Sequence, residues 1–278
     1  MGYHLLKQQP NEQVIEMEIA VLVTEVAELT GEFEFDDDSS IPVDQVTYQL
    51  NEFDAYAIEA AVRLKESLEE CTVTAVTIGP ERATEVLRTA LGKGADAAIR
   101  VWDDTLEDDQ LTCPRWKGNV LARVLERESP DIVFAGVQSE DHAFAATGVI
   151  TAHELSYEWA TIVRDFDVHD GTVEVQRELE GDVVQQVRIE LPAVLTVQTG
   201  INEPRYASLR EIRRAQNVDI HELTVGDVGV DRSDSSDGFE LQALETLETN
   251  SDAEYFTGDA DESAAQLAEL LSKRGVIS

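Results

Sequence analysis

The chain has 278 residues, of which 57 are Asp or Glu and 21 are Lys or Arg, so its formal net charge is −36. This length is enough for one large domain with an extension, and the lack of a basic excess argues against nucleic-acid binding. Apolar residues keep clear periods between the acidic ones, which argues against a disordered acidic chain. The even spread of acidic residues favours a surface suited to high salt, as in halophilic archaea, with electrostatic steering of a basic partner as the alternative.

The cysteines and histidines indicate neither a disulfide scaffold nor a metal site. Cys71 and Cys113 form no C-x-x-C pair, and the histidines are scattered without metal-ligand spacing. No apolar run approaches the roughly 18 residues of a membrane span, and no secretory leader pattern is present. We therefore expect a soluble, cytoplasmic protein without a bound metal.

The first half of the chain alternates strand and helix patterns. Residues 1–18 lack periodicity and are expected to be an N-terminal extension, and IAVLVTEV (19–26) is typical of a buried strand. After an acidic loop segment, Asn51 caps a helix whose apolar stripe runs to Leu68.

The same alternation continues to residue 135. Strands are predicted at 72–78, 97–102 and 131–135, and helices at 81–91 and 118–128. Continuous apolar strands between helices are typical of a parallel sheet covered on both faces. The fold class expected is therefore α/β, with a doubly wound, mostly parallel sheet.

Beyond Leu155 the pattern changes to alternating segments separated by turns. Asp170-Gly171 and Glu180-Gly181 are turn dipeptides on either side of TVEVQREL. They predict an antiparallel meander at the sheet edge, followed by another buried strand at 193–197. The α/β domain is expected to span residues 19–222.

Residues 223–278 are expected to form an acidic C-terminal arm. Its last helix begins near Asp259, where Glu262 completes a capping box, and presents Leu267, Leu270 and Leu271. An amphipathic helix after a polar tether either folds back on its own domain or packs on another subunit. The pattern alone leaves both alternatives open.

The loop after the strand at 131–135 is the best candidate for a binding site. Gly136 opens the segment GVQSEDHAFAATGV, which enters a helix at about Ile150. Ligands of doubly wound sheets bind beyond the carboxyl ends of strands, and the free N–H groups of a helix start attract phosphate. Nucleotide binding is one interpretation, and a merely solvated connection carrying Glu140 and Asp141 is the other. The common hydrolase, Walker and zinc-protease motifs are absent from the sequence.

A second unusual region, residues 197–219, concentrates arginines and is called here the arginine segment. It contains Arg205, Arg210, Arg213 and Arg214 around Leu209 in a chain with few basic residues. These arginines pair either with acidic groups of the same chain or with a partner. An exposed Leu209 among charges would suit docking of another protein.

At these residues the sequence resembles the electron transfer flavoprotein beta-subunit family. The segment LPAVLTVQTGINEPRYASLREIRRA is similar to that family's signature. Further matches follow the same order along residues 19–231: VLVTEVAE, NEFDAYAIEAAVRLKE, VTAVTIGP, RTALGKGAD, DIVFAGVQSEDHAFAATG, VQRELEG and GDVGVD.

The resemblance implies an electron-carrier subunit with no catalytic residues of its own. It implies an adenine-nucleotide-binding fold of the HUP type, an alpha subunit as partner, and FAD held mainly by that alpha subunit. Electrons would pass from acyl-CoA or other dehydrogenases to a membrane quinone oxidoreductase. The beta subunit would bind AMP structurally, whereas electron-bifurcating relatives hold a second FAD there. The alternative from another class is a stand-alone adenine-nucleotide module of the universal-stress type.

The resemblance also implies two sets of site residues. Nucleotide contacts would be Leu22, Asn51, Glu52, Phe53, Asp54, Ile78, Gly136, Val137, Gln138, Ser139 and Thr147. Partner recognition would involve Arg177, Glu178, Asn202, Pro204, Arg205, Tyr206 and Leu209, with Leu209 as the anchor of the arginine segment.

The sequence departs from the family pattern at three places. The phosphate-binding Asn-Gln-Thr of AMP-binding relatives is Ala145-Ala146-Thr147 here, and the bifurcating pattern D-x-D-x-x-Q-V-G is missing. Thr24 replaces a lysine of the first loop, and Gln216-Asn217-Val218 replaces a lysine-rich tail. AMP is therefore the favoured ligand, with a phosphate end that differs from that of relatives.

Overall fold

The computed structural model describes residues 16–29, 45–103, 106, 111–181, 183–230, 253 and 255–277. Residues 1–15, most of the acidic loop segment before Asn51 and most of residues 231–254 lie outside these ranges. The chain divides into two compact units, Met1–Leu241 and Gln242–Ser278, each of which is described by itself.

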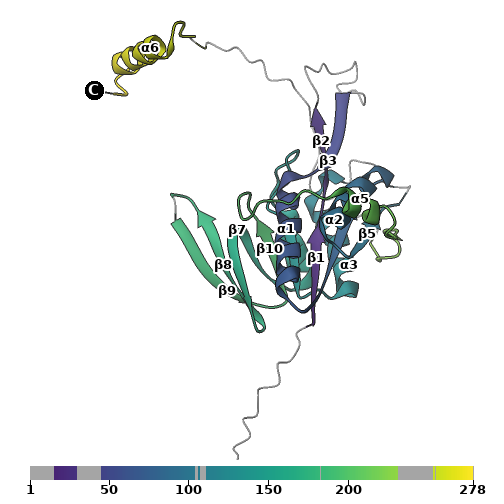
Figure 1. Ribbon diagram of the computed structural model, residues 1–278. Coiled ribbons are helices and arrows are strands. Elements are labelled where there is room, and N and C mark those ends of the chain that lie inside the picture. The colour runs from purple at the N-terminus through teal and green to yellow at the C-terminus, as the bar shows by residue number, and fades with distance from the viewer. Residues whose placement is uncertain are drawn as a thin grey trace, which may run out of the picture. The chain divides into compact units, whose positions relative to one another are not determined.

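The first unit alternates strands and helices along most of its length (Figure 1). Its elements are β1 (Glu16–Leu22), β2 (Glu25–Leu29), β3 (Val46–Leu50), α1 (Glu52–Ser67), β4 (Glu70–Ile78), the 3-10 turn η2 (Glu81–Ala83), α2 (Thr84–Lys93), β5 (Ala97–Val101), α3 (Pro114–Glu128), β6 (Ile132–Gly136), α4 (Thr147–Leu155), β7 (Glu158–His169), β8 (Thr172–Leu179), β9 (Val183–Glu190), β10 (Ala193–Val197), α5 (Leu209–Ala215) and β11 (His221–Leu223).

Within the described residues, nine strands form one sheet in the order β11-β5-β4-β1-β6-β10-β7-β8-β9. Neighbours from β11 to β7 run parallel, and β7, β8 and β9 run antiparallel. The turns at Gly171 and Gly181 join these last strands, with φ of 72° and 77° that glycine adopts without strain. The predicted parallel sheet and antiparallel edge meander are both confirmed.

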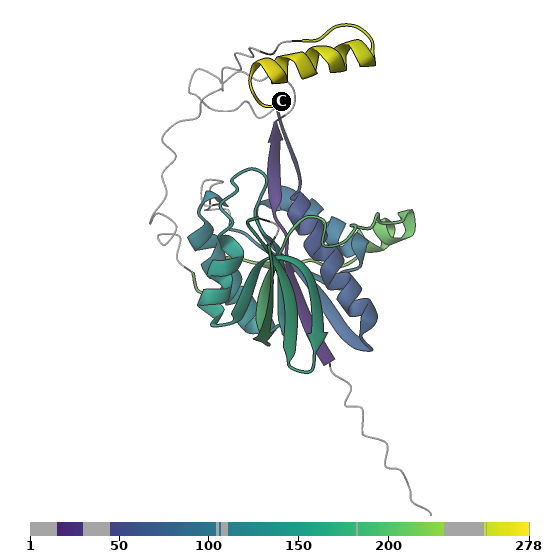
Figure 2. The same cartoon turned by 90° about the vertical axis from the view of Figure 1, so that its left-hand side faces the viewer.

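Alternate residues of each parallel strand face opposite sides of the sheet, and each side is covered by helices (Figure 2). Ile19 and Val21 of β1 pack in the core that includes α1 and α2, while Ala20 and Leu22 pack in the core that includes Trp116 of α3. This period of two explains why the strands are apolar throughout. The fold is doubly wound, as expected.

The strand order reverses at β1. The chain proceeds from β1 to β4 and β5 on one side and then returns to β6 on the other side. A doubly wound sheet opens a crevice at the carboxyl ends of its strands where the order reverses. The ends of β1 at Leu22 and of β6 at Gly136 therefore mark the expected ligand position.

Several element bounds differ from the expectations. The first strand begins at Glu16, with Met17 buried in the core, and it ends at Leu22, so the run 19–26 is split between β1 and β2. The helix expected at 118–128 begins at Pro114, since proline suits the first helical turn. The helix expected from Ile150 begins at Thr147. The core extends past residue 222, because Val225, Val228 and Val230 are buried.

The second unit contains α6 (Ala260–Lys273). Asp259 and Glu262 form the predicted capping box, with Glu262 N donating to Asp259 Oδ1 at 2.9 Å. None of the residues of α6 is buried, and Leu267 is 45% exposed. No described helix is both long and apolar enough to cross a membrane.

Candidate functional site

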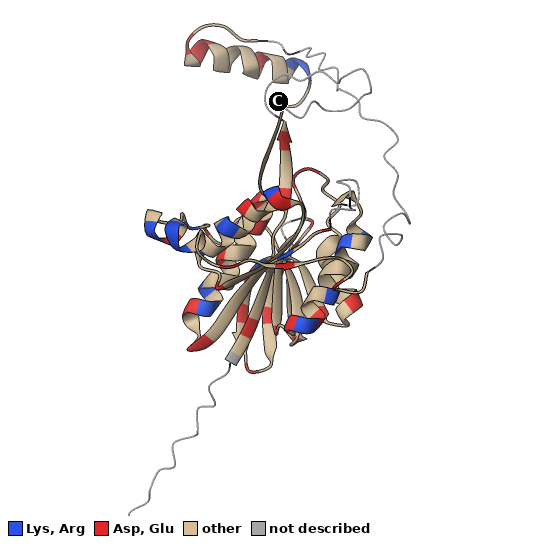
Figure 3. Ribbon diagram, turned by 90° about the vertical axis from the view of Figure 1, so that its right-hand side faces the viewer, with Lys and Arg blue, Asp and Glu red and all other residues tan. Residues whose placement is uncertain are grey.

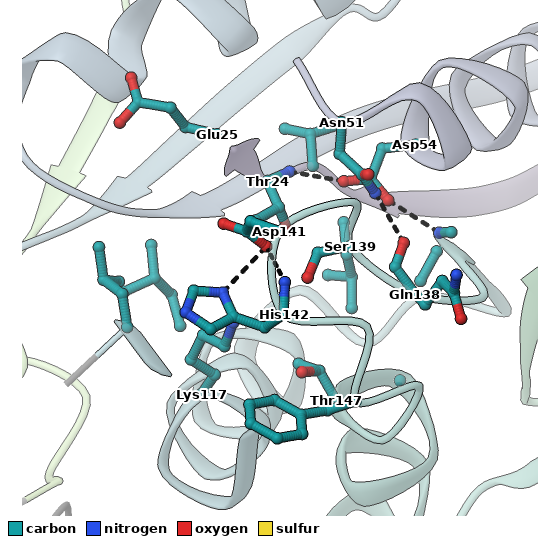
Figure 4. A pocket seen from close by; sticks show the side chains of 18 of the residues that line it. Thr24, Glu25, Asn51, Asp54, Lys117, Gln138, Ser139, Asp141, His142 and Thr147 are labelled. Carbon is teal, nitrogen blue, oxygen red and sulfur yellow. Dashed lines mark hydrogen bonds and ion pairs between the residues drawn. The ribbon is translucent and has the colours of Figure 1, made fainter. Parts of the chain in front are cut away.

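A cavity of about 280 Å³ lies where the strand order reverses (Figure 4). Residues 22–25 after β1 and 135–139 at the end of β6 line it, together with the loop and helix start at 144–148. Its inner wall is apolar, formed by Leu22, Val76, Ile78, Leu121 and Ala135. Its volume lies near the lower end of the about 300–1,000 Å³ typical of small-molecule sites, which suits a mononucleotide better than a dinucleotide.

Asp54 joins three segments around this cavity. Its buried carboxylate accepts hydrogen bonds from the backbone N–H of Thr24 at 2.7 Å and of Gly136 at 2.9 Å. Burial raises the pKa of Asp54 to about 7, although hydrogen bonds from Gly136, Thr24 and Asn51 oppose this shift. Asp54 therefore fixes the ends of β1 and β6 relative to α1 while keeping a titratable group beside the cavity.

Asn51 and Glu140 tie the cavity loop to the start of α1. Asn51 Nδ2 donates to the carbonyl oxygen of Gln138 at 2.9 Å, and Asn51 Oδ1 accepts from Glu140 N at 3.2 Å. Glu140 Oε2 in turn accepts from the backbone N–H of Glu52 at 2.9 Å, where a helix start favours negative charge. Glu140 is thus used by the protein itself and does not face the cavity as a free charge.

Asp141 and His142 both line the cavity, with His142 Nδ1 and Asp141 Oδ1 2.9 Å apart. Burial opposes ionisation of Asp141, but hydrogen bonds from His142 and Ser139 outweigh it and lower its pKa to about 2. Lys117 of α3 also lines the cavity (Figure 4). Burial lowers its pKa, and the charges of Asp141 and Asp54 partly offset this effect.

The structure brings most of the expected nucleotide contacts together around the cavity. The expected contacts that line it are Leu22, Asn51, Asp54, Ile78, Gly136, Val137, Gln138, Ser139 and Thr147. Glu52 and Phe53 do not line it: Glu52 is exposed at the helix start, and Phe53 packs behind Gly136.

Gly136 serves the fold more directly than a ligand. A Cβ built on it would lie 2.5 Å from Asp54 Oδ1 and 2.6 Å from Phe53 Cβ. Glycine at this position therefore permits the close approach of α1 to the end of β6.

Two parts of the lining were not expected from the sequence. The hairpin of β2 and β3 contributes Tyr48, over whose ring Arg82 lies at 4.2 Å, while Arg82 Nε also donates to Glu25. The first turns of α3 contribute Lys117. Pro114 could have indicated that α3 begins there, because proline is frequent at helix starts.

In the arginine segment, Arg205 forms ion pairs within the chain. Its guanidinium donates to Glu59 through Nε at 2.8 Å and through Nη2 at 3.1 Å, and also binds Glu66. The Glu59 side chain is only 3% exposed, and hydrogen bonds from Arg205 and Arg63 outweigh the effect of burial and lower its pKa. Arg214 likewise turns inward and donates to Leu91 O at 2.9 Å. The alternative of intramolecular ion pairing thus holds for Arg205, whereas Arg214 binds a backbone carbonyl group.

Apolar side chains of the same segment face outward. Tyr206 is 99% exposed and Leu209 is 75% exposed. Leu209 is the first residue of α5, which begins with a capping box between Ser208 and Glu211 and was not predicted as a helix. Arg210 and Arg213 of α5 form no ion pair with any described residue. Figure 3 shows that basic residues gather on this helix.

The remaining residues expected to recognise partners divide into internal and exposed groups. Arg177 donates to Thr161 O and Oγ1, each at 2.8 Å, beside Ile162, whose φ of 56° is rare for a β-branched residue. Asn202 Nδ2 donates to Tyr56 O at 3.0 Å, and Pro204 is half-buried. Glu178 is exposed on β8. Among the described residues, no group of three His, Cys, Asp or Glu side chains could hold a metal ion.

Comparison with known proteins gives one consistent result. The model of a family described as electron transfer flavoprotein domain matches residues 41–228. The electron transfer flavoprotein subunit beta of Methylophilus methylotrophus is 38% identical over 263 residues, covering 92% of this chain and 98% of that protein. Proteins of the same name from Mus musculus and Bradyrhizobium diazoefficiens are 37% and 35% identical, covering 70% and 87% of this chain and 76% and 92% of their own lengths. The chain belongs to the electron transfer flavoprotein beta-subunit family.

Proposed function

We propose that this chain pairs with an alpha subunit and carries electrons with it from dehydrogenases to a membrane quinone oxidoreductase. FAD, held mainly by the alpha subunit, supplies the redox chemistry when bound. The residues of this chain bind, orient and shield, and none acts as a nucleophile or base. Family membership over most of the chain is the observation that carries this proposal.

Two exposed apolar regions support the pairing with another subunit. On the meander, Trp159, Leu179, Val183 and Val184 are between 38% and 53% exposed. In the second unit, α6 has an apolar stripe that no described residue buries. Exposed apolar groups of this kind are typical of protein interfaces. We infer that the alpha subunit covers both, so that α6 packs on the partner.

The cavity supports AMP as a structural ligand. Its apolar wall suits a purine ring, and Thr147 with the start of α4 suits a phosphate. Its volume is small for the whole of a second FAD. The proposed contacts are therefore those cavity-lining residues expected from the resemblance, without Glu52 and Phe53.

The exposed face of the arginine segment supports docking of an acyl-CoA or other dehydrogenase. Tyr206 and Leu209 stand free beside Arg210 and Arg213, which combines an apolar anchor with positive charge. Arg205 holds the segment on α1 through Glu59 and Glu66 and is a positioning residue rather than a contact.

The full-length chain, expressed with and without the alpha subunit of the same organism, tests the proposal. Native mass spectrometry should find a one-to-one complex that holds one FAD and one AMP, whereas the chain expressed alone should hold no FAD. Stoichiometric FAD in the isolated chain would contradict this arrangement. A chain that binds ATP and recovers no partner would instead favour the stand-alone nucleotide module.

A further inference from the structure

Lys117 is a cation beside the start of α4. It precedes Gly118, and a Cβ built on Gly118 would lie 2.5 Å from Ile150 Cγ2 and 3.2 Å from the backbone N of Thr151. The two helices therefore touch within the first turns of α4. Both Lys117 and Thr147 line the cavity, as Figure 4 shows.

The Lys117 amine lies beside the cavity without a partner. Its side chain is half-buried and belongs to the cavity lining. It makes no ion pair or hydrogen bond with any described residue, although Asp141 and Asp54 are near enough to act on it electrostatically. Asp141 instead pairs with His142. An ammonium group that is partly removed from water without a partner is destabilising unless a ligand supplies the missing charge.

The start of α4 presents donors to the same space. Its N-cap residue, Ala146, provides no side-chain oxygen for the helix, and the N–H groups of Thr147, Gly148 and Val149 have no acceptor among the described residues. The loop before it holds Ala143 and Ala145 at φ of 53° and 51°, a conformation that costs free energy for alanine. Free N–H groups at a helix start bind anions.

We propose that Lys117 and the free N–H groups of α4 together form the phosphate-binding end of the cavity and take the phosphate monoester of a nucleotide. This inference rests on the proposal that the cavity binds an adenine nucleotide. It assigns the charge needed at that end to Lys117 of α3, because Ala145 and Ala146 before α4 offer no polar side chain. The ligand would neutralise the ammonium group, and the ammonium group would offset the negative field of Asp141 and Asp54.

Calorimetric titration of the complete complex tests this assignment, with the bound nucleotide first removed and the ionic strength held fixed. AMP, adenosine and inorganic phosphate are the probes. Wild-type complex should bind AMP more tightly than adenosine. Lys117→Met should weaken AMP binding about ten- to a hundredfold, as expected for the loss of a hydrogen bond to a charged group, and leave adenosine binding unchanged.

Arg115→Met is the matched control, since it removes the same charge from an exposed position of the same helix. It should leave the ratio of AMP to adenosine affinity at the wild-type value. Equal loss in both variants would show a general charge effect, and an unchanged ratio in Lys117→Met would show that the lysine only balances internal charge. Either result overturns the inference while leaving nucleotide binding intact. Failure of the wild type to bind both AMP and adenosine overturns the proposed nucleotide site as well.

A measurement on the wild type covers the case in which Lys117→Met does not fold. The chain has five lysines, so labelling with an amine-specific reagent can be followed at each by mass spectrometry. AMP should protect Lys117 several-fold more than adenosine does and leave the exposed Lys273 unchanged. Equal protection by AMP and adenosine would contradict a phosphate contact.

Discussion

The cavity and the arginine segment both follow buried strands, yet their polar residues are arranged in opposite ways. Around the cavity, Asp54 and Asn51 bind backbone groups of neighbouring segments and hold a space open between them. In the arginine segment, Arg205 instead forms ion pairs with Glu59 and Glu66 of the same chain. A cluster of polar residues in a sequence therefore does not reveal whether it surrounds a ligand or neutralises itself.

The two regions also differ in the sign of their response to pH. Asp54 is an acid whose pKa in the fold, about 7, exceeds its ordinary value of 3.8, so its ionisation disfavours the folded state. Glu59 is an acid whose pKa is lowered, so its ionisation favours the folded state. The contribution of Glu59 is present above its ordinary pKa and is lost as the pH falls through the lowered value.

The largest expected effect concerns Asp54. Between about pH 4 and pH 7 the folded protein keeps a proton on Asp54 that the unfolded chain releases, so stability falls as the pH rises and is constant above pH 7. Asp54→Asn removes this dependence. Relative to the variant, the wild type should therefore lose about 4 kcal/mol of unfolding free energy between about pH 4 and pH 7. Each unit of the pKa shift contributes about 1.4 kcal/mol.

Thr77→Val is the control for Asp54→Asn. Thr77 is also buried, and its hydroxyl donates to Val23 O at 2.7 Å, but it does not titrate. Its variant should be less stable by about 1 kcal/mol at every pH. Chemical denaturation at several pH values measures the unfolding free energy of both variants. If the unfolding free energies of the wild type and of Asp54→Asn changed with pH in the same way, the raised pKa would be contradicted.

The next effect concerns Arg205. Arg205→Met leaves the buried Glu59 with Arg63 as its remaining ion-pair partner, and Arg63 is half exposed. We expect a loss of about 3 kcal/mol near neutral pH, at the low end for a broken buried pair because Arg205 is itself 31% exposed. The loss should shrink as the pH falls and Glu59 takes up a proton. Denaturation of the complex at two pH values measures it, and a loss independent of pH would show that packing of the arginine stem matters more than its charge.

A third variant, Gly136→Ala, tests how tightly α1 closes the cavity. The added Cβ would clash with Asp54 and with the backbone of Phe53, so α1 must shift, at a cost of about 2 kcal/mol. Gly226→Ala is the control, because its Cβ would meet only Thr224 Oγ1, at an ordinary 3.7 Å. Thermal unfolding of the two variants should differ by several degrees. Equal melting temperatures would mean that α1 is free to move away from β6.

The sequence predicted the sheet and the position of the cavity, because these follow from apolar periodicity and from strand order. Most of the cavity lining was expected only from the family resemblance. The sequence did not predict Lys117 as part of the lining, since only the packing of Gly118 on Ile150 brings α3 to the cavity. It also did not predict that Arg205 points inward and Tyr206 outward. In an irregular segment, no regular period relates the directions of adjacent side chains.

The smallest expected effect on stability, and the sharpest contrast with Arg205→Met, comes from Leu209→Ala. Leu209 is 75% exposed, so its loss should change the unfolding free energy by less than about 0.5 kcal/mol. Electron transfer from a partner dehydrogenase should nevertheless weaken about thirtyfold at low dehydrogenase concentration, the effect of a lost anchor worth about 2 kcal/mol. Exchange of Ile277, an exposed apolar residue of the second unit, for Ala provides the matched control. Stopped-flow flavin reduction measures both. If the rate of flavin reduction is the same in both variants as in the wild type, the docking surface lies outside the arginine segment. The outward-facing residues of that segment would then have no assigned partner.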